Sequence, residues 1–274
     1  MEHQDHAIEP TEPVPAPLPS ALDHLEAIRQ TSAHKQLVIF LDYDGTLTPI
    51  VPRPEDANLA ETMRAVLGDL ARTQTVAIVT GRDLQDVQRR VALDTIYYAG
   101  SHGFEIAGPN GLHDIYAPVH DFLSALDAAE TALCERLHGI PGAQVERKHF
   151  AIAIHYRRVS ASATSSIQTT VEAVQQAHPS LRQTGGKKVF ELRPKLDWHK
   201  GTALFWLLDA MGLARDAVLL VYIGDDVTDE DAFAALPREG IGILVAEQPR
   251  QTAARYQLAS TEQVGTFLMA LTKM

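Results

Sequence analysis

Five short apolar runs alternate with helical patterns, and this alternation constrains the fold more than any other feature of the chain. The runs are QLVIFLD, TVAIVTG, IYYAGSHG, AVLLVYIG and IGILVAE. Between the first two runs, one face of a predicted helix carries Leu59, Met63, Val66, Leu67 and Leu70. Strands that alternate with helices form a parallel sheet covered by crossover helices. The sequence therefore predicts an α/β fold.

A long interval, residues 108–194, interrupts this alternation and has a different pattern. It begins with a PNGL turn and a predicted helix over 119–138. The alternating runs AQVERK and FAIAIHYRR follow, and then a second predicted helix at 162–177. A hairpin around Gly185 and Gly186 closes the interval. These features predict an inserted domain with its own strands and helices.

The chain therefore divides into three predicted parts. Residues 21–107 and 195–274 form a core domain, and residues 108–194 form an inserted α/β cap. Residues 1–20 contain five prolines among acids and few large apolar groups. Such a segment buries too little apolar surface to offset its conformational entropy, so we expect a disordered extension. If the cap moves against the core, its hinges are expected near 107–111 and 193–195.

The overall charge excludes several classes of partner. With 24 basic and 35 acidic residues the net charge is -11, which argues against binding to nucleic acid or anionic lipid. No apolar run approaches the roughly 18 to 20 residues of a membrane-spanning helix. The single cysteine, Cys134, excludes an intrachain disulfide, and the N-terminus lacks a secretory pattern. We therefore expect a cytoplasmic protein.

Polar clusters directly follow three of the predicted strands. They are DYDGT at 42–46, TGR at 80–82 and GDDVTDED at 224–231. Ligands of open parallel sheets bind beyond the carboxyl ends of the strands. A solvated loop explains any one of these clusters, but it does not explain why three of them fall on the same edge. The sequence predicts a functional site there.

The residue types in these clusters favour magnesium and phosphoryl transfer. Gathered carboxylates need a cation, and ligands that are all oxygen suit Mg²⁺. No cysteine or histidine has zinc-like spacing beside them. One carboxylate of the pair Asp42 and Asp44 can attack a phosphoryl group and form an aspartyl phosphate. The other can protonate the leaving oxygen and then activate water.

These clusters, with a lysine before a predicted helix, resemble the four motifs of the haloacid dehalogenase superfamily in their order. The resemblance implies a Rossmann-like core with a cap and a Mg²⁺-dependent phosphatase. It implies that Asp42 is the nucleophile, Asp44 the general acid and base, Thr80 the hydroxyl bonded to phosphate and Lys200 the cation that steadies it. It also implies a metal site of Asp42, the Asp44 carbonyl and Asp225, with Asp226 or Asp229 as a direct or water-mediated ligand.

Several of these residues have simpler alternatives. Thr80 could cap the helix that starts near Asp83, and Lys200 could be an ordinary solvated lysine. Gly81 and Arg82 belong to the candidate phosphate-binding cluster, although Arg82 could instead pair with Asp86 one turn later. The sequence leaves these alternatives open.

Motifs in both predicted domains resemble the trehalose-6-phosphate phosphatase family. They are YAGSHG, VERKHFAIAIHYR and KVFELRP, together with GDDVTDED, and the resemblance covers residues 36–274. It implies that Glu146, Lys148 and Glu191 bind glucose hydroxyls. Glu146 and Lys148 are two apart on a predicted strand and so share one face, but a surface salt bridge between them is the alternative. His102 and Arg157 either contact substrate or only pack the hinge and the cap.

The resemblance implies hydrolysis of trehalose 6-phosphate through an aspartyl phosphate, with a trehalose-6-phosphate synthase as a possible partner. One alternative is a related phosphatase that acts on sucrose phosphate, a mannosyl phosphoglycerate or another sugar phosphate. Another is a non-catalytic sugar-phosphate sensor or a regulatory partner of a trehalose synthase. Such a module can lose its reacting groups and keep its fold. The presence of Asp42, Asp44, Lys200 and Asp225 favours the enzyme.

Overall fold

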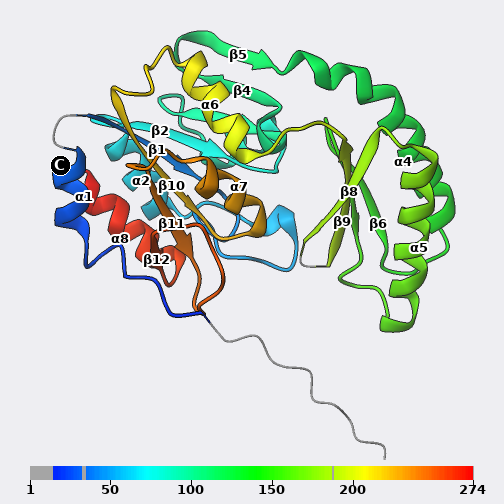
Figure 1. The fold of residues 1–274 in the computed structure, drawn as a ribbon. Coiled ribbons are helices and arrows are strands. Elements are labelled where there is room, and N and C mark those ends of the chain that lie inside the picture. Colours follow the sequence, from blue (N-terminus) through cyan, green and yellow to red (C-terminus); the bar gives the residue numbers. More distant parts are fainter. Residues whose placement is uncertain (1–14, 33–34, 187, 274) are drawn as a thin grey trace, which may run out of the picture.

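The computed structural model describes residues 15–32, 35–186 and 188–273, and its largest element is an eight-stranded sheet (Figure 1). From one edge to the other the strands are β12 (Tyr256–Leu258), β11 (Ile241–Val245), β10 (Val218–Gly224), β1 (Gln36–Leu41), β2 (Thr75–Val79), β3 (Tyr97–Gly100), β4 (Glu105–Gly108) and β5 (Leu112–Ile115). The first six in this order pair in parallel, and β4 and β5 add an antiparallel edge. The predicted parallel α/β fold is confirmed.

Helices cover both faces of this central sheet. The helices on one face are α1 (Leu25–Ser32), α2 (Glu61–Leu70), α3 (Leu84–Val91) and α8 (Thr261–Leu271), and those on the other are α6 (Lys200–Ala210) and α7 (Val227–Ala235). Strand β1 is continuously apolar because helices cover both of its faces. Ile39 packs with the first group and Phe40 with the second, and both are fully buried. Each such side chain contributes about 1.5 to 3 kcal/mol of burial free energy.

A second sheet of four antiparallel strands lies beside the first (Figure 1). Its order is β6 (Gln144–Arg147), β7 (Ile152–His155), β9 (Val189–Pro194) and β8 (Leu181–Gly186). Figure 1 shows α4 (Leu123–Leu137) and α5 (Ala161–Ala177) covering the side of this sheet that faces away from the central sheet. Its other side lines the cavity described below with Glu146, His155, Thr184 and Glu191. Among the described helices, none is both long enough and apolar enough to cross a membrane.

The boundary predicted at residue 108 differs from the one that the sheets define. Strand β4 pairs with β3 and then with β5, and Ile106 of β4 is fully buried in the core of the central domain. The whole hairpin therefore belongs to the central sheet. The chain leaves that sheet only after Ile115 and returns to the central domain after Pro194. A hinge near 107–111 is not compatible with this pairing.

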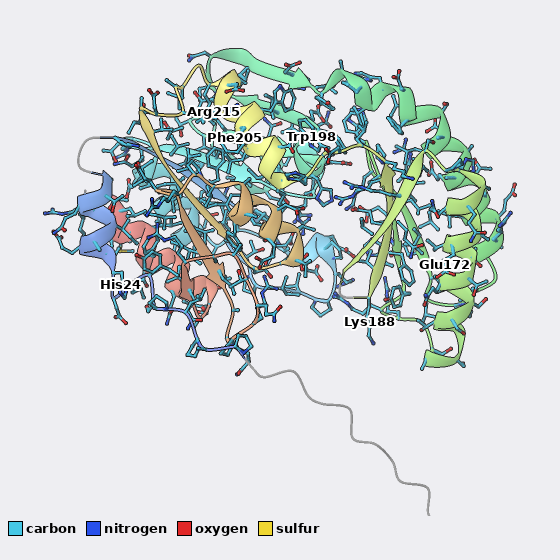
Figure 2. All side chains as sticks on the ribbon, in the orientation of Figure 1. His24, Glu172, Lys188, Trp198, Phe205 and Arg215 are labelled. Carbon is cyan, nitrogen blue, oxygen red and sulfur yellow. The ribbon has the colours of Figure 1, made fainter. Side chains whose placement is uncertain are left out.

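Aromatic rings pack the two connections between the sheets. Trp198, labelled in Figure 2 between the second sheet and α6, stacks on Tyr116 of the outgoing connection with ring centroids 4.0 Å apart. Phe104 lies on the same indole, with a centroid distance of 5.7 Å. The described residues also form four short 3-10 helices: η1 (Pro54–Asp56), η2 (Ser101–Gly103), η3 (Pro109–Gly111) and η4 (Ala117–Phe122).

The N-terminal segment differs in part from the predicted extension. Residues 1–14 lie outside the described residues. Leu18 packs against the core, and Ser20 pairs with Gln257 beside the edge strand β12. The backbone N–H of Gln257 also donates to the carbonyl of Pro19 at 3.0 Å. This pairing, which extends the sheet edge, is not visible in the proline-rich composition.

Candidate active site

A cavity of about 390 Å³ lies between the loops at the carboxyl ends of the central strands and the inner face of the second sheet. Every residue predicted as catalytic or substrate-binding lines it, and so do the predicted metal ligands except Asp229. These residues are Asp42, Asp44, Thr80, Gly81, Arg82, His102, Glu146, Lys148, Arg157, Glu191, Lys200, Asp225 and Asp226. Their positions in the sequence span both domains, so only the fold brings them together.

Asp42 lies at the end of β1, where the strand meets its neighbours. Its backbone N–H donates to Ile223 of β10 at 2.9 Å, and the side chain is nearly buried. Gly45 turns the chain just beyond it with φ +85°, in the left-handed region. A Cβ on Gly45 would lie 2.1 Å from a carboxylate oxygen of Asp225. The glycine is therefore required for the close approach of the DYDGT and GDDVTDED loops.

Lys200, the first residue of α6, lines the cavity and binds two acids. Its Nζ donates to Oδ1 of Asp42 and to Oδ1 of Asp229, each at 2.7 Å. Burial alone would lower the pKa of Lys200, but the carboxylates of Asp229 and Asp42 raise it. The lysine is 3% exposed, which excludes the solvated alternative. It remains charged and holds the Asp42 carboxylate in place.

Asp229 organises this part of the site from a fully buried position. Besides Lys200, its carboxylate accepts a hydrogen bond from the hydroxyl of Tyr222 at 2.7 Å. Its second oxygen accepts from the backbone N–H groups of Asp225 at 3.0 Å and Asp226 at 2.9 Å. Four donors therefore bind the carboxylate of Asp229. It orients these groups and has little capacity left to bind a metal ion.

The chemistry of the acids fits a metal ion. Oxygen atoms of Asp42, Asp225 and Asp229 lie within 4.8 Å of one another. Burial raises the pKa of Asp42 well above its usual range, and repulsion from Asp229 and Asp225 adds to this, although Lys200 acts in the opposite direction. A cation would relieve that repulsion. The predicted ligand Asp226 is not a member of this cluster; it is the exposed N-cap residue of α7.

The TGR motif follows β2 and contributes a hydroxyl and a guanidinium. Thr80 is buried, and its hydroxyl oxygen accepts a hydrogen bond from the backbone N–H of Arg82 at 3.2 Å. Helix α3 begins later, at Leu84, so Thr80 is not its cap. The guanidinium of Arg82 binds Asp86 at 2.9 Å, as one alternative predicted. It also binds both oxygens of Asp44 at 2.7 Å, which the sequence did not predict.

The inner face of the second sheet presents one row of residues to the cavity. Strand register places Glu146 of β6 opposite Ala153 of β7, Ala153 opposite Glu191 of β9 and Glu191 opposite Thr184 of β8. All four line the cavity. Side chains alternate between the faces of a strand, so Ile152 and Ile154 on the other face pack in the core. The row crosses the whole sheet.

Glu191 is the centre of a buried hydrogen-bonded group in this row. It accepts from Lys148 Nζ at 2.9 Å and from His102 Nε2 at 3.0 Å. Burial would raise the pKa of Glu191, but Lys148 and His102 lower it far below its usual range. Burial lowers the pKa of His102 even though Glu191 acts against this. Because His102 belongs to the central domain, this group also joins the two domains.

Glu146 and Lys148 do not follow the predicted salt-bridge alternative. Glu146 pairs with His155 Nε2 at 2.7 Å, and this hydrogen bond lowers the pKa of Glu146. Lys148 pairs with Glu191 and approaches the carbonyl of Gly81 at 3.4 Å. Both charged side chains therefore face the cavity with partners of their own.

Two further contacts hold the second sheet over the catalytic edge. The guanidinium of Arg157 donates to the carbonyls of Val51 at 2.8 Å and Pro52 at 2.6 Å. Asp83, after the TGR motif, accepts from the backbone N–H of His149 at 3.0 Å. Arg157 thus has a bridging role and also lines the cavity.

Sequence reasoning missed several residues of the cavity. Ala153 and His155 of β7 and Thr184 of β8 lie on other strands than Glu146 and Glu191, so alternation along one strand does not reach them. Arg250, which follows β11 and lines the cavity, has no sequence signal either. Its position depends on the parallel order of the strands.

Comparisons with known proteins find similar chains over most of this sequence. A family model described as trehalose-phosphatase matches residues 40–262. "Probable trehalose-phosphate phosphatase D" of Arabidopsis thaliana is 43% identical over 264 residues, which are 92% of this chain and 72% of that protein. "Probable trehalose-phosphate phosphatase 4" of Oryza sativa subsp. japonica is 42% identical over 258 residues, with coverages of 92% and 70%. The crystal structure of a trehalose-6-phosphate phosphatase related protein has a TM-score of 0.76 and 27% identity, covering 86% of this chain and 97% of that one.

Proposed function

Since the chain belongs to the trehalose-phosphatase family, we propose that it hydrolyses trehalose 6-phosphate to trehalose and phosphate through an aspartyl phosphate on Asp42. One observation carries the proposal. A single cavity has the acids and Lys200 on one side and the row from Glu146 to Thr184 on the other. A phosphate ester with a polyol leaving group needs both sides at once.

In the first step the carboxylate of Asp42 attacks phosphorus and the bond to the sugar oxygen breaks. Asp44 gives its proton to that oxygen, so trehalose leaves as a neutral alcohol. Lys200 keeps the Asp42 carboxylate oriented through its hydrogen bond at 2.7 Å. The oxygen of Thr80 already accepts the N–H of Arg82, so its own proton is available to a phosphoryl oxygen.

In the second step water attacks the phosphorus of the aspartyl phosphate and the carboxylate of Asp42 is released. Asp44, now ionised, takes the proton of that water. The site is then restored and phosphate leaves. Two acids with different tasks explain why the motif carries Asp42 and Asp44 on one short turn.

Mg²⁺ is the cation that we propose for the acid cluster. Asp42, Asp225 and the backbone carbonyl of Asp44 would hold it, because Asp229 is occupied by its four donors. When bound, the ion supplies positive charge that stabilises the phosphoryl oxygens.

Glu191, Lys148 and Glu146 are proposed to bind the sugar hydroxyls. They offer charged acceptors and a charged donor on one face, and the cavity shields them partly from water. A ligand that lacks a matching hydroxyl leaves one of these groups unpaired, which is the physical basis of selectivity.

Phosphate release from trehalose 6-phosphate, measured with Mg²⁺ and again with EDTA, tests the function. We expect turnover that depends on the added ion. A panel with sucrose 6-phosphate and glucose 6-phosphate tests the substrate. Faster turnover of another sugar phosphate would assign the cavity to that ester, and no phosphate release from any of them would contradict the proposal.

We also propose a cytosolic location. A single cysteine, Cys134, supports it, since an intrachain disulfide needs two. Association with a trehalose-6-phosphate synthase stays a prediction, which co-purification with the tagged chain can test.

A further inference from the structure

We propose that Arg82 is a positioning residue that fixes the carboxylate of Asp44 for proton transfer, and that it is not a ligand of the phosphoryl group. The inference rests on the proposed role of Asp44 as acid and base. It concerns a contact between two motifs that are 38 residues apart in the sequence.

The contact between Arg82 and Asp44 is a two-point fork. Nε donates to Oδ2 and Nη2 donates to Oδ1, both at 2.7 Å. Two parallel bonds fix the plane of a carboxylate as well as its position, which a single bond does not do. The side chain of Asp44 is 37% exposed, so the enclosing protein alone restrains it little. Its orientation is therefore set by the guanidinium.

Arg82 has little capacity left for the phosphoryl group. Besides the two bonds to Asp44, Nη1 donates to Asp86 at 2.9 Å and Nη2 donates to the carbonyl of Pro54 at 2.8 Å. These four bonds use four of the five N–H groups of a guanidinium. A two-point grip on phosphate would require Arg82 to release at least one of these partners. The side chain is only 10% exposed, which also disfavours that rearrangement.

Groups outside the reacting centre hold Arg82 itself. Asp86, one turn further along α3, also accepts from Nε of Arg90 at 2.8 Å. Nη1 of Arg90 donates at 3.1 Å to the carbonyls of Glu55 and Ala57, in the loop that follows the nucleophile motif. Helix α3 and this loop thus determine where the Asp44 carboxylate lies.

This role predicts a dependence on the leaving group. In the first step Asp44 gives a proton to the leaving oxygen as the phosphorus–oxygen bond breaks. A leaving group that is stable as an anion needs little help from that proton, whereas a weakly acidic alcohol needs it fully. A misplaced Asp44 should therefore slow esters of weakly acidic alcohols most. A lost phosphate ligand should slow all esters alike.

The test compares Arg82→Gln and Arg82→Lys with the unaltered chain on p-nitrophenyl phosphate, phenyl phosphate and a simple alkyl phosphate. We expect kcat/KM to fall roughly ten- to a hundred-fold on the alkyl ester and only a few-fold on the p-nitrophenyl ester. Lysine keeps the charge without the fork, so Arg82→Lys should lose as much as Arg82→Gln. Inhibition by inorganic phosphate should change little.

Equal losses on all three esters, together with weaker inhibition by phosphate, would overturn the inference and assign Arg82 to the phosphoryl group. Full activity of Arg82→Lys would also overturn it, since charge alone would then suffice. Asp86→Asn should shift the series in the same direction by a smaller factor. Arg64→Gln is a matched control and should leave the ester series unchanged. Arg64 donates to the carbonyls of Arg90 and Val91, at the end of α3 that is far from Arg82.

The esters in this series contain no sugar, so the outcome does not depend on which sugar phosphate is the substrate. A chain that hydrolyses them but not trehalose 6-phosphate would contradict the proposed substrate and still decide the role of Arg82.

Discussion

Replacement of Glu191 by glutamine tests whether the second sheet recognises the sugar. Glu191 is 12% exposed and accepts charged hydrogen bonds from Lys148 and a further bond from His102. Glutamine has nearly the same shape but only one acceptor and no charge. The variant therefore removes the interaction that holds Lys148 toward the cavity without creating a large void.

The expected loss follows from these contacts. A hydrogen bond to a charged group is worth about 1.5 to 3 kcal/mol. At 1.4 kcal/mol for each factor of ten, this corresponds to a roughly ten- to hundred-fold decrease in kcat/KM on trehalose 6-phosphate. The small ester p-nitrophenyl phosphate does not extend to the second sheet, so its hydrolysis should change less than about three-fold. The contrast between the two substrates is the measured quantity.

Glu172→Gln is the matched control in the same domain. Glu172 lies on the exposed side of α5, as labelled in Figure 2, and accepts from Gln168 one turn away. It should leave both activities unchanged. Equal losses of Glu191→Gln on the two substrates would mean that Glu191 supports the fold and not the sugar. No loss on trehalose 6-phosphate would refute the assigned sugar site.

Three further changes follow from the site. Asp42→Asn should abolish turnover, because an amide is a poor nucleophile, while the temperature of thermal unfolding stays near that of the unaltered chain. Substantial residual turnover would contradict the aspartyl phosphate. Gly45→Ala should lower the temperature of thermal unfolding more than Gly111→Ala. Both glycines have positive φ, but only a Cβ at Gly45 would meet another group, the Asp225 carboxylate at 2.1 Å. Folding lowers the pKa of Glu191 from its ordinary value of 4.5. The ionised Glu191 therefore stabilises the folded state above that pH, and this contribution to the unfolding free energy is lost as the pH falls. The difference in unfolding free energy between the unaltered chain and Glu191→Gln should therefore shrink below about pH 4.5. A difference that grows there would contradict a lowered pKa of Glu191.

Much of the catalytic edge could be predicted because it is local. A buried strand that ends in DYDGT places two acids beyond the sheet whatever the rest of the chain does. The burial of Lys200 and its bonds to two acids agree with its predicted place beside the reacting groups. The alternation within VERKHF likewise placed Glu146 and Lys148 on one face. Their partners, His155 and Glu191, could not be assigned, since alternation gives a face but no neighbour across strands.

Where the prediction failed, pairing over long distances was responsible. The run from 105 to 115 contains a hairpin signal but no sign of which sheet it joins, and β4 joins β3 of the central sheet. Asp226 and Asp229 have equal claims in the motif GDDVTDED. In the structure, the backbone turn before α7 buries Asp229 against Lys200 and Tyr222 and leaves Asp226 exposed.

The α/β alternation, the inserted segment and the kinds of reacting groups at the strand ends could all be predicted from the sequence. These depend on periodicity and on neighbouring residues along the chain, which are present before folding. Three features became visible only in the folded protein: Arg82 holds Asp44, Glu191 joins Lys148 to His102, and both domains enclose one cavity. Hydrogen bonds between side chains depend on distances of about 3 Å, and strand register and domain packing set these distances for residues that are far apart in the sequence.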